Sequence, residues 1–161
     1  MKIKKATEKD LNEIINIYNK ARDFMKESGN GGQWQNGYPQ KELLENDIKN
    51  GVLYICLDRN KIVGVFCYFI GIEPTYKKIY GGKWLNNEPY GVIHRIAVGE
   101  HYKGVASFCI QWCINNAHNI KIDTHENNIP MQKTILKNGF TFCGTIKKED
   151  GTSRLAYQIV K

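Results

Sequence analysis

The chain has 161 residues, 42% of them apolar, and a formal net charge of +7. This length and apolar content suit one compact domain with a full hydrophobic core, and they argue against a disordered chain. No apolar run is long enough to cross a membrane, and no apolar signal core follows the N-terminal lysines. We therefore expect residues 1–161 to form a single cytoplasmic domain without a membrane partner.

The five cysteines and the basic net charge bear on whether the chain binds a metal ion or nucleic acid. The cysteines form no Cys-x-x-Cys pair and lie in apolar stretches, so we expect reduced, buried thiols and no metal site. A positive charge is compatible with nucleic-acid binding, but the lysines are scattered and no nucleic-acid motif accompanies them. The simpler interpretation is a solvated basic surface whose field attracts an anionic cofactor. Monomer and homodimer are both compatible with the sequence.

Hydrophobic spacing and turn residues predict the order of strands and helices. Apolar residues at helical spacing follow Thr7, which is placed to cap a helix, and Pro39 fits the first turn of a second helix. Runs rich in β-branched residues predict strands. The expected elements are a strand at 1–5, a helix at 7–29, a helix at 39–50, strands at 52–57, 61–70 and 90–98, a helix at 105–117, a strand at 120–124, a helix that starts at 128, and strands at 141–147 and 153–160. This order predicts a mixed α/β fold with one central sheet.

Two segments between these elements lack regular patterning. Asn30–Tyr38 contains three glycines, which disfavour regular structure, and its aromatic residues either pack on the core or line a pocket. Gly71–Pro89 is about twenty residues long, and loops of that length inside a compact domain tend to be functional or to contain further structure. Both segments are therefore candidates for a ligand site.

The stretch Tyr90–Ala117 carries the clearest functional signal. It predicts a strand, a loop that contains Gly104, and a helix that begins at Val105. The N-terminus of a helix presents unpaired N–H groups and the positive end of the helix dipole, which together attract phosphate. Neither common phosphate-loop motif is present. We hypothesise that this turn binds the pyrophosphate of a cofactor. The alternative is an ordinary strand–helix turn in which Gly104 supplies backbone freedom.

Two linked motifs extend this hypothesis. The segment His101–Ala106, HYKGVA, resembles the Gln/Arg-x-x-Gly-x-Gly/Ala signature of the GNAT superfamily of acyl-CoA-dependent N-acetyltransferases, with His101 in place of the usual Gln or Arg. The segment Asn128–Phe140 resembles the family's Asn-x-x-Ala-x-x-Leu-Tyr-x-Lys-x-Gly-Phe helix. The matching residues are Gly104 and Ala106 in the first motif, and Asn128, Lys137, Gly139 and Phe140 in the second. The resemblance covers roughly the whole chain and is strongest over 90–144.

The resemblance implies a GNAT-like fold, a mixed sheet of about six to seven strands with helices on both faces. It also implies that an acetyl group moves from acetyl-CoA to a primary amine of a small molecule or peptide by direct attack. The backbone of Ile96, Ala97 and Val98 would pair with pantetheine where the family's central strands splay, and a backbone N–H would polarise the thioester carbonyl. Asn128 matches the family's cofactor-contacting asparagine and is also placed to cap a helix. The residues that would bind the pyrophosphate are His101, Tyr102, Lys103, Gly104, Val105, Ala106 and Ser107.

The proton transfers call for a base. A lysine-like amine has a pKa of about 10.4, so presenting it neutral at pH 7 costs roughly 4–5 kcal/mol. Many family members place a glutamate on the central strand, and this strand has none. His125 and His94 are the candidate bases, the alternatives being a strand-end residue bonded to backbone and a packed core histidine. Asp123 or Glu126 would orient either one, and Arg95 would pair with Asp123 in a structural role.

The family's usual general-acid tyrosine is replaced here by Ile135. Either another donor such as Tyr102 serves, or the CoA thiolate leaves unaided. The second route is feasible because the thiol has a pKa of about 8.5. This departure makes a catalytically inactive CoA-binding domain the alternative function. The acceptor would enter opposite the cofactor, against Trp34, Tyr38 and Trp84, whose rings suit an amine with an apolar or cationic body. The alternative for these aromatics is that they cover the edge of the core.

Overall fold

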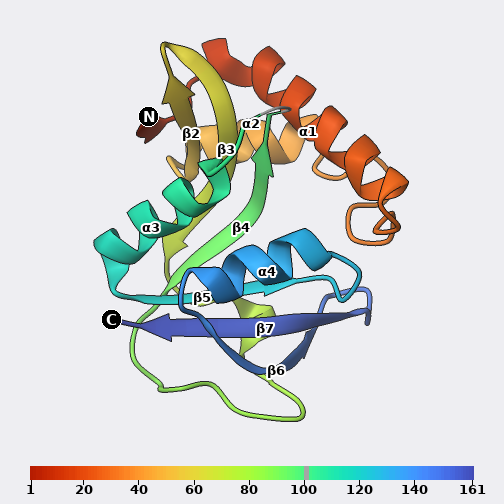
Figure 1. Ribbon diagram of the computed structural model, residues 1–161, viewed down its shortest axis with the longest axis vertical. Coiled ribbons are helices and arrows are strands. Elements are labelled where there is room, and N and C mark those ends of the chain that lie inside the picture. Colours follow the sequence, from red (N-terminus) through yellow and green to blue (C-terminus); the bar gives the residue numbers. More distant parts are fainter. Residues whose placement is uncertain (100–101) are drawn as a thin grey trace.

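Seven strands form one mixed sheet in the computed structural model, which describes residues 1–99 and 102–161 (Figure 1). The strand order is β1-β2-β3-β4-β5-β7-β6, and every neighbouring pair is antiparallel except β4 and β5. The strands are β1 (Lys2–Lys5), β2 (Leu53–Asp58), β3 (Lys61–Ile70), β4 (Gly91–Val98), β5 (Asn119–Thr124), β6 (Thr141–Lys147) and β7 (Ser153–Val160). The helices are α1 (Leu11–Glu27), α2 (Lys41–Lys49), α3 (Val105–Ala117) and α4 (Ile129–Lys137), with short 3-10 turns η1 (Glu8–Asp10) and η2 (Pro74–Tyr76).

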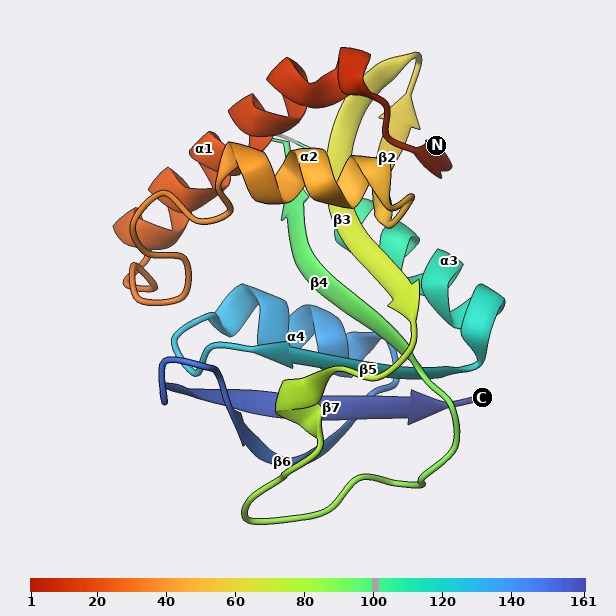
Figure 2. The same ribbon diagram turned by 180° about the vertical axis from the view of Figure 1, so that it is seen from behind.

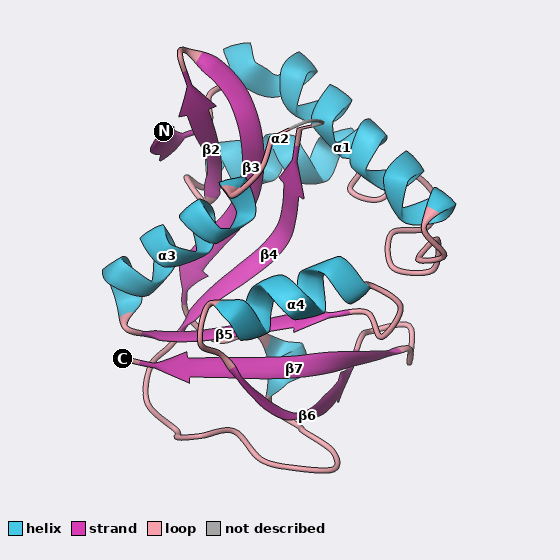
Figure 3. Cartoon of the chain, in the orientation of Figure 1, coloured by secondary structure: helices cyan, strands magenta, loops and turns pink. Residues whose placement is uncertain are grey.

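Helices cover both faces of the sheet (Figure 3). α1 and α2 pack on one face, where Ile14, Leu44 and Val65 belong to one buried cluster. α3 and α4 pack on the other face, where Ile114 and Ile135 belong to a second. Each helix buries an apolar stripe against the sheet, which is the arrangement that its hydrophobic spacing predicts. The predicted mixed sheet with helices on both faces is confirmed.

Local sequence signals account for most of the element ends. Arg59 and Asn60 form the two-residue turn between β2 and β3, with φ of 52° and 63°, as the hairpin turns that match strand twist require. Asn128 caps α4 with its side chain. The placement of Pro39 in the first turn of α2 is wrong. The residue after it keeps an extended backbone, so the helix begins two residues later than the proline.

The long segment between β3 and β4 contains further structure. Besides η2, it forms an isolated bridge between Tyr80 and Thr145 of β6. The ammonium of Lys121 on β5 lies 4.3 Å from the ring centre of Trp84 and 4.0 Å from that of Tyr90. These cation–π contacts and the bridge hold the segment against β4, β5 and β6. Within the same segment, Tyr76 of η2 is buried with Val92, Ile146 and Ala156 on the sheet.

β4 contains the irregularity that opens the sheet. Its pairing with β5 joins Gly91–Ile93 to Ile120–Ile122, and the two strands then diverge (Figures 1 and 2). Just beyond the paired residues, Arg95 has φ of 52°, in the left-handed region, and the register with β3 shifts between Val65 and Cys67. A bulge of this kind bends a strand away from its neighbour. The bulge therefore creates the gap in which a ligand could lie.

Three further features concern the expectations from composition: the cysteines, the hydrophobicity of the helices and the metal-ligating side chains. All five cysteines are free and buried, as their apolar surroundings predicted. Among the described residues, no helix has the length and apolar character that a membrane crossing needs. Residues 1–99 and 102–161 hold no group of three or more His, Cys, Asp or Glu side chains arranged for a metal ion.

Candidate active site

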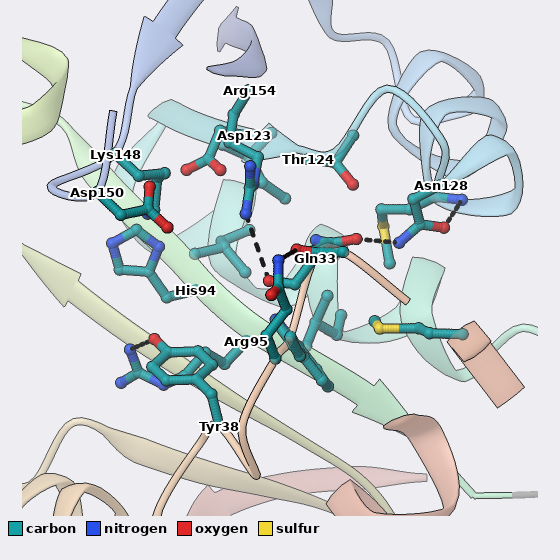
Figure 4. Close-up of a pocket in the computed structure, with 18 of the residues that line it drawn as sticks. Gln33, Tyr38, His94, Arg95, Asp123, Thr124, Asn128, Lys148, Asp150 and Arg154 are labelled. Carbon is teal, nitrogen blue, oxygen red and sulfur yellow. Dashed lines mark hydrogen bonds between the residues drawn. The ribbon is translucent and has the colours of Figure 1, made fainter. Parts of the chain in front are cut away.

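A cavity of about 460 Å³ lies where β4 and β5 diverge (Figure 4). Its walls come from the middle of β4, the end of β5, the start of α4, the loop between α1 and α2, and the turn between β6 and β7. The lining residues with polar side chains include Gln33, Tyr38, Glu73, His94, Arg95, Asp123, Thr124, Asn128, Lys148, Asp150 and Arg154. The cavity therefore combines these polar groups with apolar surface, which includes Trp34, Ile96 and Met131.

His94 lines this cavity from β4 and is paired with a carboxylate. Its Nε2 atom lies 2.8 Å from Oε1 of Glu73, which comes from the segment between β3 and β4, and both side chains are 13% exposed. Burial alone raises the pKa of the Glu73 carboxyl, but the hydrogen bond and charge of His94 outweigh it, so that pKa lies below its ordinary value. Glu73 is thus an ionised hydrogen-bond acceptor that orients the imidazole.

The predicted pairing of Arg95 with Asp123 is wrong. The Arg95 guanidinium forms an ion pair with Asp47 of α2 and donates to the Tyr38 hydroxyl at 3.2 Å. Asp123 instead accepts a hydrogen bond from the Tyr76 hydroxyl at 2.6 Å. The bulge explains the difference, because β4 has left β5 at this position and Arg95 lies against α2 instead of beside β5. The ion pair and the Tyr38 contact anchor the α1–α2 loop beside the cavity.

The segment predicted to hold the cofactor follows the bulge. Beyond the bulge, Ala97 and Val98 pair with Val65 and Gly64 of β3, while the other edge of β4 faces the gap. Gly104 begins α3 with φ of 77°, and a Cβ built there would meet no atom within 4 Å. The first N–H groups of α3 therefore lie at an open helix start, as anion binding requires. His101 lies outside the described residues.

The other members of that predicted set lie at the start of α3. Tyr102 is half-buried on the core that α3 covers, and Lys103 is exposed. Val105 is buried, while Ala106 and Ser107 are half-buried. The Ser107 hydroxyl accepts a hydrogen bond from the Asn138 amide at 3.0 Å.

Asn128 has two partners that tie the cavity walls together. Its Oδ1 atom accepts from the Met131 backbone N–H at 3.2 Å, so it caps α4 as the sequence indicated. Its Nδ2 atom donates to Oε1 of Gln33 at 2.9 Å, and Asn30 donates to the same oxygen at 2.7 Å. The backbone carbonyl of Gln33 accepts from Arg154 at 3.3 Å. Gln33 thus joins the α1–α2 loop to α4 and to β7.

His125, the other candidate base, does not line the cavity. Its Nδ1 atom accepts from the Asn127 backbone N–H at 3.0 Å. Burial lowers the pKa of the His125 imidazole, and the nearby charge of Arg154 adds to that effect. These contacts fit the alternative foreseen for it, a strand-end residue bonded to backbone.

The three aromatic residues predicted to contact the acceptor separate in the structure. Trp34 and Tyr38 line the cavity, and Trp34 also packs edge-on against Tyr18 of α1 at 5.6 Å between ring centres. Trp84 does not line the cavity. It donates from Nε1 to the Tyr76 carbonyl at 2.8 Å and packs against the Tyr76 ring.

Several residues of the site were not among the predicted site residues, and Glu73, Thr124, Gln33 and Arg154 stand out among them. Glu73 lies in the long segment whose length signalled function, but nothing in the sequence paired it with His94. Thr124 ends β5, and its buried hydroxyl has no hydrogen-bond partner among the described residues. Gln33 and Arg154 carried no signal, because they belong to a glycine-rich loop and a plain strand. Their roles depend on which elements the fold brings together.

The sheet and the site together define a class of protein. A mixed sheet whose one parallel pair diverges beside an open helix start is the arrangement that the resemblance to acyl-CoA N-acyltransferases implied. The chain matches the acetyltransferase (GNAT) family over residues 11–140, and it belongs to that family.

Solved structures agree with this assignment. An acetyltransferase of the GNAT family from Streptococcus agalactiae 2603 is 31% identical, with a TM-score of 0.91 over 99% of this chain and 95% of that one. A GNAT-family acetyltransferase from Listeria monocytogenes 4b F2365 is 19% identical, with a TM-score of 0.70 over 98% and 92%, and shares the fold. The NatB acetyltransferase complex bound to CoA and MES also shares the fold, at 12% identity and a TM-score of 0.69 over 100% of both chains. The comparison with curated proteins found no match.

Proposed function

We propose that this acetyltransferase moves the acetyl group of acetyl-CoA to a primary amine of a small molecule or peptide by direct attack. The observation that carries this proposal is the His94–Glu73 pair, in which His94 lies on β4 at the point where the sheet opens. A base at this position would stand between the cofactor gap and the acceptor cavity. The cofactor is taken as acetyl-CoA because the family transfers acetyl groups and one structural neighbour was solved with CoA.

The start of α3 and the free edge of β4 would hold the cofactor. The first N–H groups of α3 would bind the diphosphate, with the positive end of the helix dipole. The backbone of Ile96–Val98 would pair with the pantetheine amides, and a backbone N–H of this segment would polarise the thioester carbonyl. Asn128 would contact the cofactor from the opposite side of the gap, while its cap to α4 keeps the side chain oriented.

The state of Glu73 determines how His94 would act. An ionised carboxylate only accepts hydrogen bonds, so His94 must donate to it from Nε2. A neutral His94 then carries its lone pair on Nδ1, and that atom would take the proton of the attacking amine. The imidazolium that forms would be stabilised by the carboxylate beside it.

The leaving thiolate would depart without a protein proton donor. Ile135, at the family's tyrosine position, is fully buried in the core. Tyr102 does not line the cavity and packs on the same core. A thiol with a pKa of about 8.5 leaves readily as the anion, so transfer remains chemically feasible.

The test measures CoA thiol release from acetyl-CoA over a panel of primary amines, with mass spectrometry of the products. We expect turnover with at least one amine, and His94→Gln to lower kcat by about 10²- to 10⁴-fold, the usual contribution of a general base. The glutamine amide keeps a donor toward Glu73, so the fold and the binding of acetyl-CoA should be retained.

His125→Asn is the matched control. Its amide oxygen can still accept from the Asn127 N–H, and we expect kcat within about threefold of wild type because His125 lies outside the cavity wall. CoA binding without turnover for any amine would favour the alternative of an inactive CoA-binding domain. A loss of activity in the His125 variant alone would transfer the role of base to that residue.

A further inference from the structure

We infer that the acceptor amine carries a carboxylate close to its amino group, as a free amino acid does, and that Arg154 binds this carboxylate. The inference rests on the proposed amine acetyltransferase activity and specifies its substrate class. It is motivated by a cation whose setting the fold alone does not explain. Arg154 is only 7% exposed, yet it lines the acceptor cavity.

The register of three strands places Arg154 on the same face of the sheet as the proposed base. Ile93 pairs with Ile122, so the next residues, His94 and Asp123, lie side by side where β4 begins to leave β5. Asp123 lies opposite Ala156 of β7. Arg154 is two residues from Ala156, and side chains two apart on a strand share a face. Figure 4 shows His94, Asp123 and Arg154 around one opening.

The same register gives an estimate of the distance between His94 and Arg154, the residues proposed to contact the two ends of the acceptor. His94 and Arg154 are two strand spacings and two residues apart, or about 12 Å between Cα atoms at ordinary sheet geometry. Both side chains line the same cavity of about 460 Å³, so a small molecule is the size of ligand that would reach from one to the other. A compact acceptor that bears both an amine and an acid fits this distance better than a long polyamine.

The Arg154 guanidinium is surrounded by neutral acceptors. It donates to the Gln33 carbonyl at 3.3 Å, to the Ser153 carbonyl at 2.9 Å and to the Thr152 hydroxyl at 3.2 Å. A guanidinium has five N–H donors, so donors remain for a ligand. Within residues 1–99 and 102–161, no carboxylate lies at ion-pair distance from it. Asp150 reaches it only through Thr152, whose hydroxyl donates to that carboxylate at 2.6 Å.

A nearly buried cation without a direct counter-ion is costly, and a bound carboxylate would offset that cost. The planar guanidinium also matches a carboxylate with two parallel hydrogen bonds. At the other end of the opening, the His94–Glu73 pair would attract the ammonium group before it loses its proton, and Asp123 lies between this pair and Arg154. The site therefore has complementary charge for both ends of an amino acid.

The experiment compares matched acceptors on the wild-type enzyme. Each of the common amino acids is assayed for CoA release beside its carboxamide and its decarboxylated amine. We expect at least one free amino acid to be acetylated with kcat/KM about a hundredfold or more above its two neutral counterparts, because a site built for a polar group rejects analogues that lack it. Equal or faster turnover of the carboxamide, which resembles a peptide N-terminus, would overturn the inference while the proposed activity stands. The absence of turnover with every acceptor would instead overturn the proposed activity and this inference with it.

Two variants link the preference to one side chain. In Arg154→Gln, the ratio of kcat/KM for the free amino acid to kcat/KM for its carboxamide should fall from about a hundredfold or more to about one. Lys148→Gln removes another cation from the cavity wall and should leave the preference within about threefold of wild type. Equal losses in both variants would mean that a general positive field, and not Arg154, selects the substrate. Should Arg154→Gln fail to fold, the wild-type comparison still decides between acid and amide.

Discussion

The position of the cofactor diphosphate can be tested at Gly104 with a Gly104→Asp variant. A Cβ at Gly104 meets no atom within 4 Å, so the new side chain fits without a clash. The left-handed backbone, with φ of 77°, costs most L-residues roughly 1–2 kcal/mol and less for Asp and Asn. A carboxylate at a helix N-terminus recovers about 0.3–1 kcal/mol. We therefore expect the free energy of unfolding to change by less than about 1.5 kcal/mol.

The affinity for CoA should change far more than the stability. Two unit charges 4 Å apart near a protein surface repel each other by about 4 kcal/mol. The start of α3 is exposed, so we halve this energy for screening by salt to about 2 kcal/mol, which weakens binding about thirtyfold. Calorimetric titration with CoA measures the dissociation constant, and thermal unfolding of the same samples verifies the fold.

Gly104→Asn is the matched control because it has the same shape and backbone strain without the charge. The Asp variant should bind CoA more weakly than the Asn variant, and the difference should shrink as the salt concentration rises. Pantetheine, which lacks the diphosphate, should not distinguish the two variants. Equal affinity of both variants for CoA would place the diphosphate elsewhere and refute the assignment of this helix start.

Two further predictions concern the segment between β3 and β4. The pKa of Glu73 is depressed in the fold, so the stability that the carboxylate contributes is present above its ordinary pKa of 4.5 and is lost as the pH falls through the lower folded value. The stability advantage of wild type over Glu73→Gln should therefore shrink in acid, and urea unfolding across pH measures it; an advantage that grows on acidification would contradict the pairing with His94. A Cβ at Gly82 would lie 1.9 Å from the Cys143 carbonyl oxygen, so Gly82→Ala should destabilise the fold by roughly 1–3 kcal/mol or more. Gly31→Ala, whose Cβ would lie 3.4 Å from its nearest neighbour, should change stability by less than about 0.5 kcal/mol, and similar thermal shifts for both alanine variants would rule out the close contact at Gly82.

The choice between the two histidines illustrates the limit of sequence reasoning about the site. Both residues follow or occupy buried strands, and only His125 has acidic neighbours along the chain, Asp123 and Glu126. Only the folded chain shows that His94 meets Glu73, which lies 21 residues away, while His125 is bonded to a nearby backbone N–H. Sequence distance carries no information about a pair that depends on how a long segment folds back over a strand.

The wrong prediction of a partner for Arg95 has a related cause. Alternation and strand adjacency predict a partner on the neighbouring strand, and that expectation holds as far as Ile93. The bulge then breaks both regularities within two residues, and Arg95 meets Asp47 of α2 instead. The sequence of β4 does not predict the bulge, because arginine is not a residue type that favours a left-handed backbone.

The sequence alone determined the elements, their order, the helix start at Gly104, the capping role of Asn128 and the family resemblance. These features depend on local periodicity, turn chemistry and short motifs, each of which is complete within a few neighbouring residues. The tertiary structure decided which strands diverge, where the acceptor cavity lies, and which side chains from distant segments surround it. The physical reason is that an ion pair, a shared hydrogen bond or a buried cation such as Arg154 is a property of several elements packed together, and no single segment contains it.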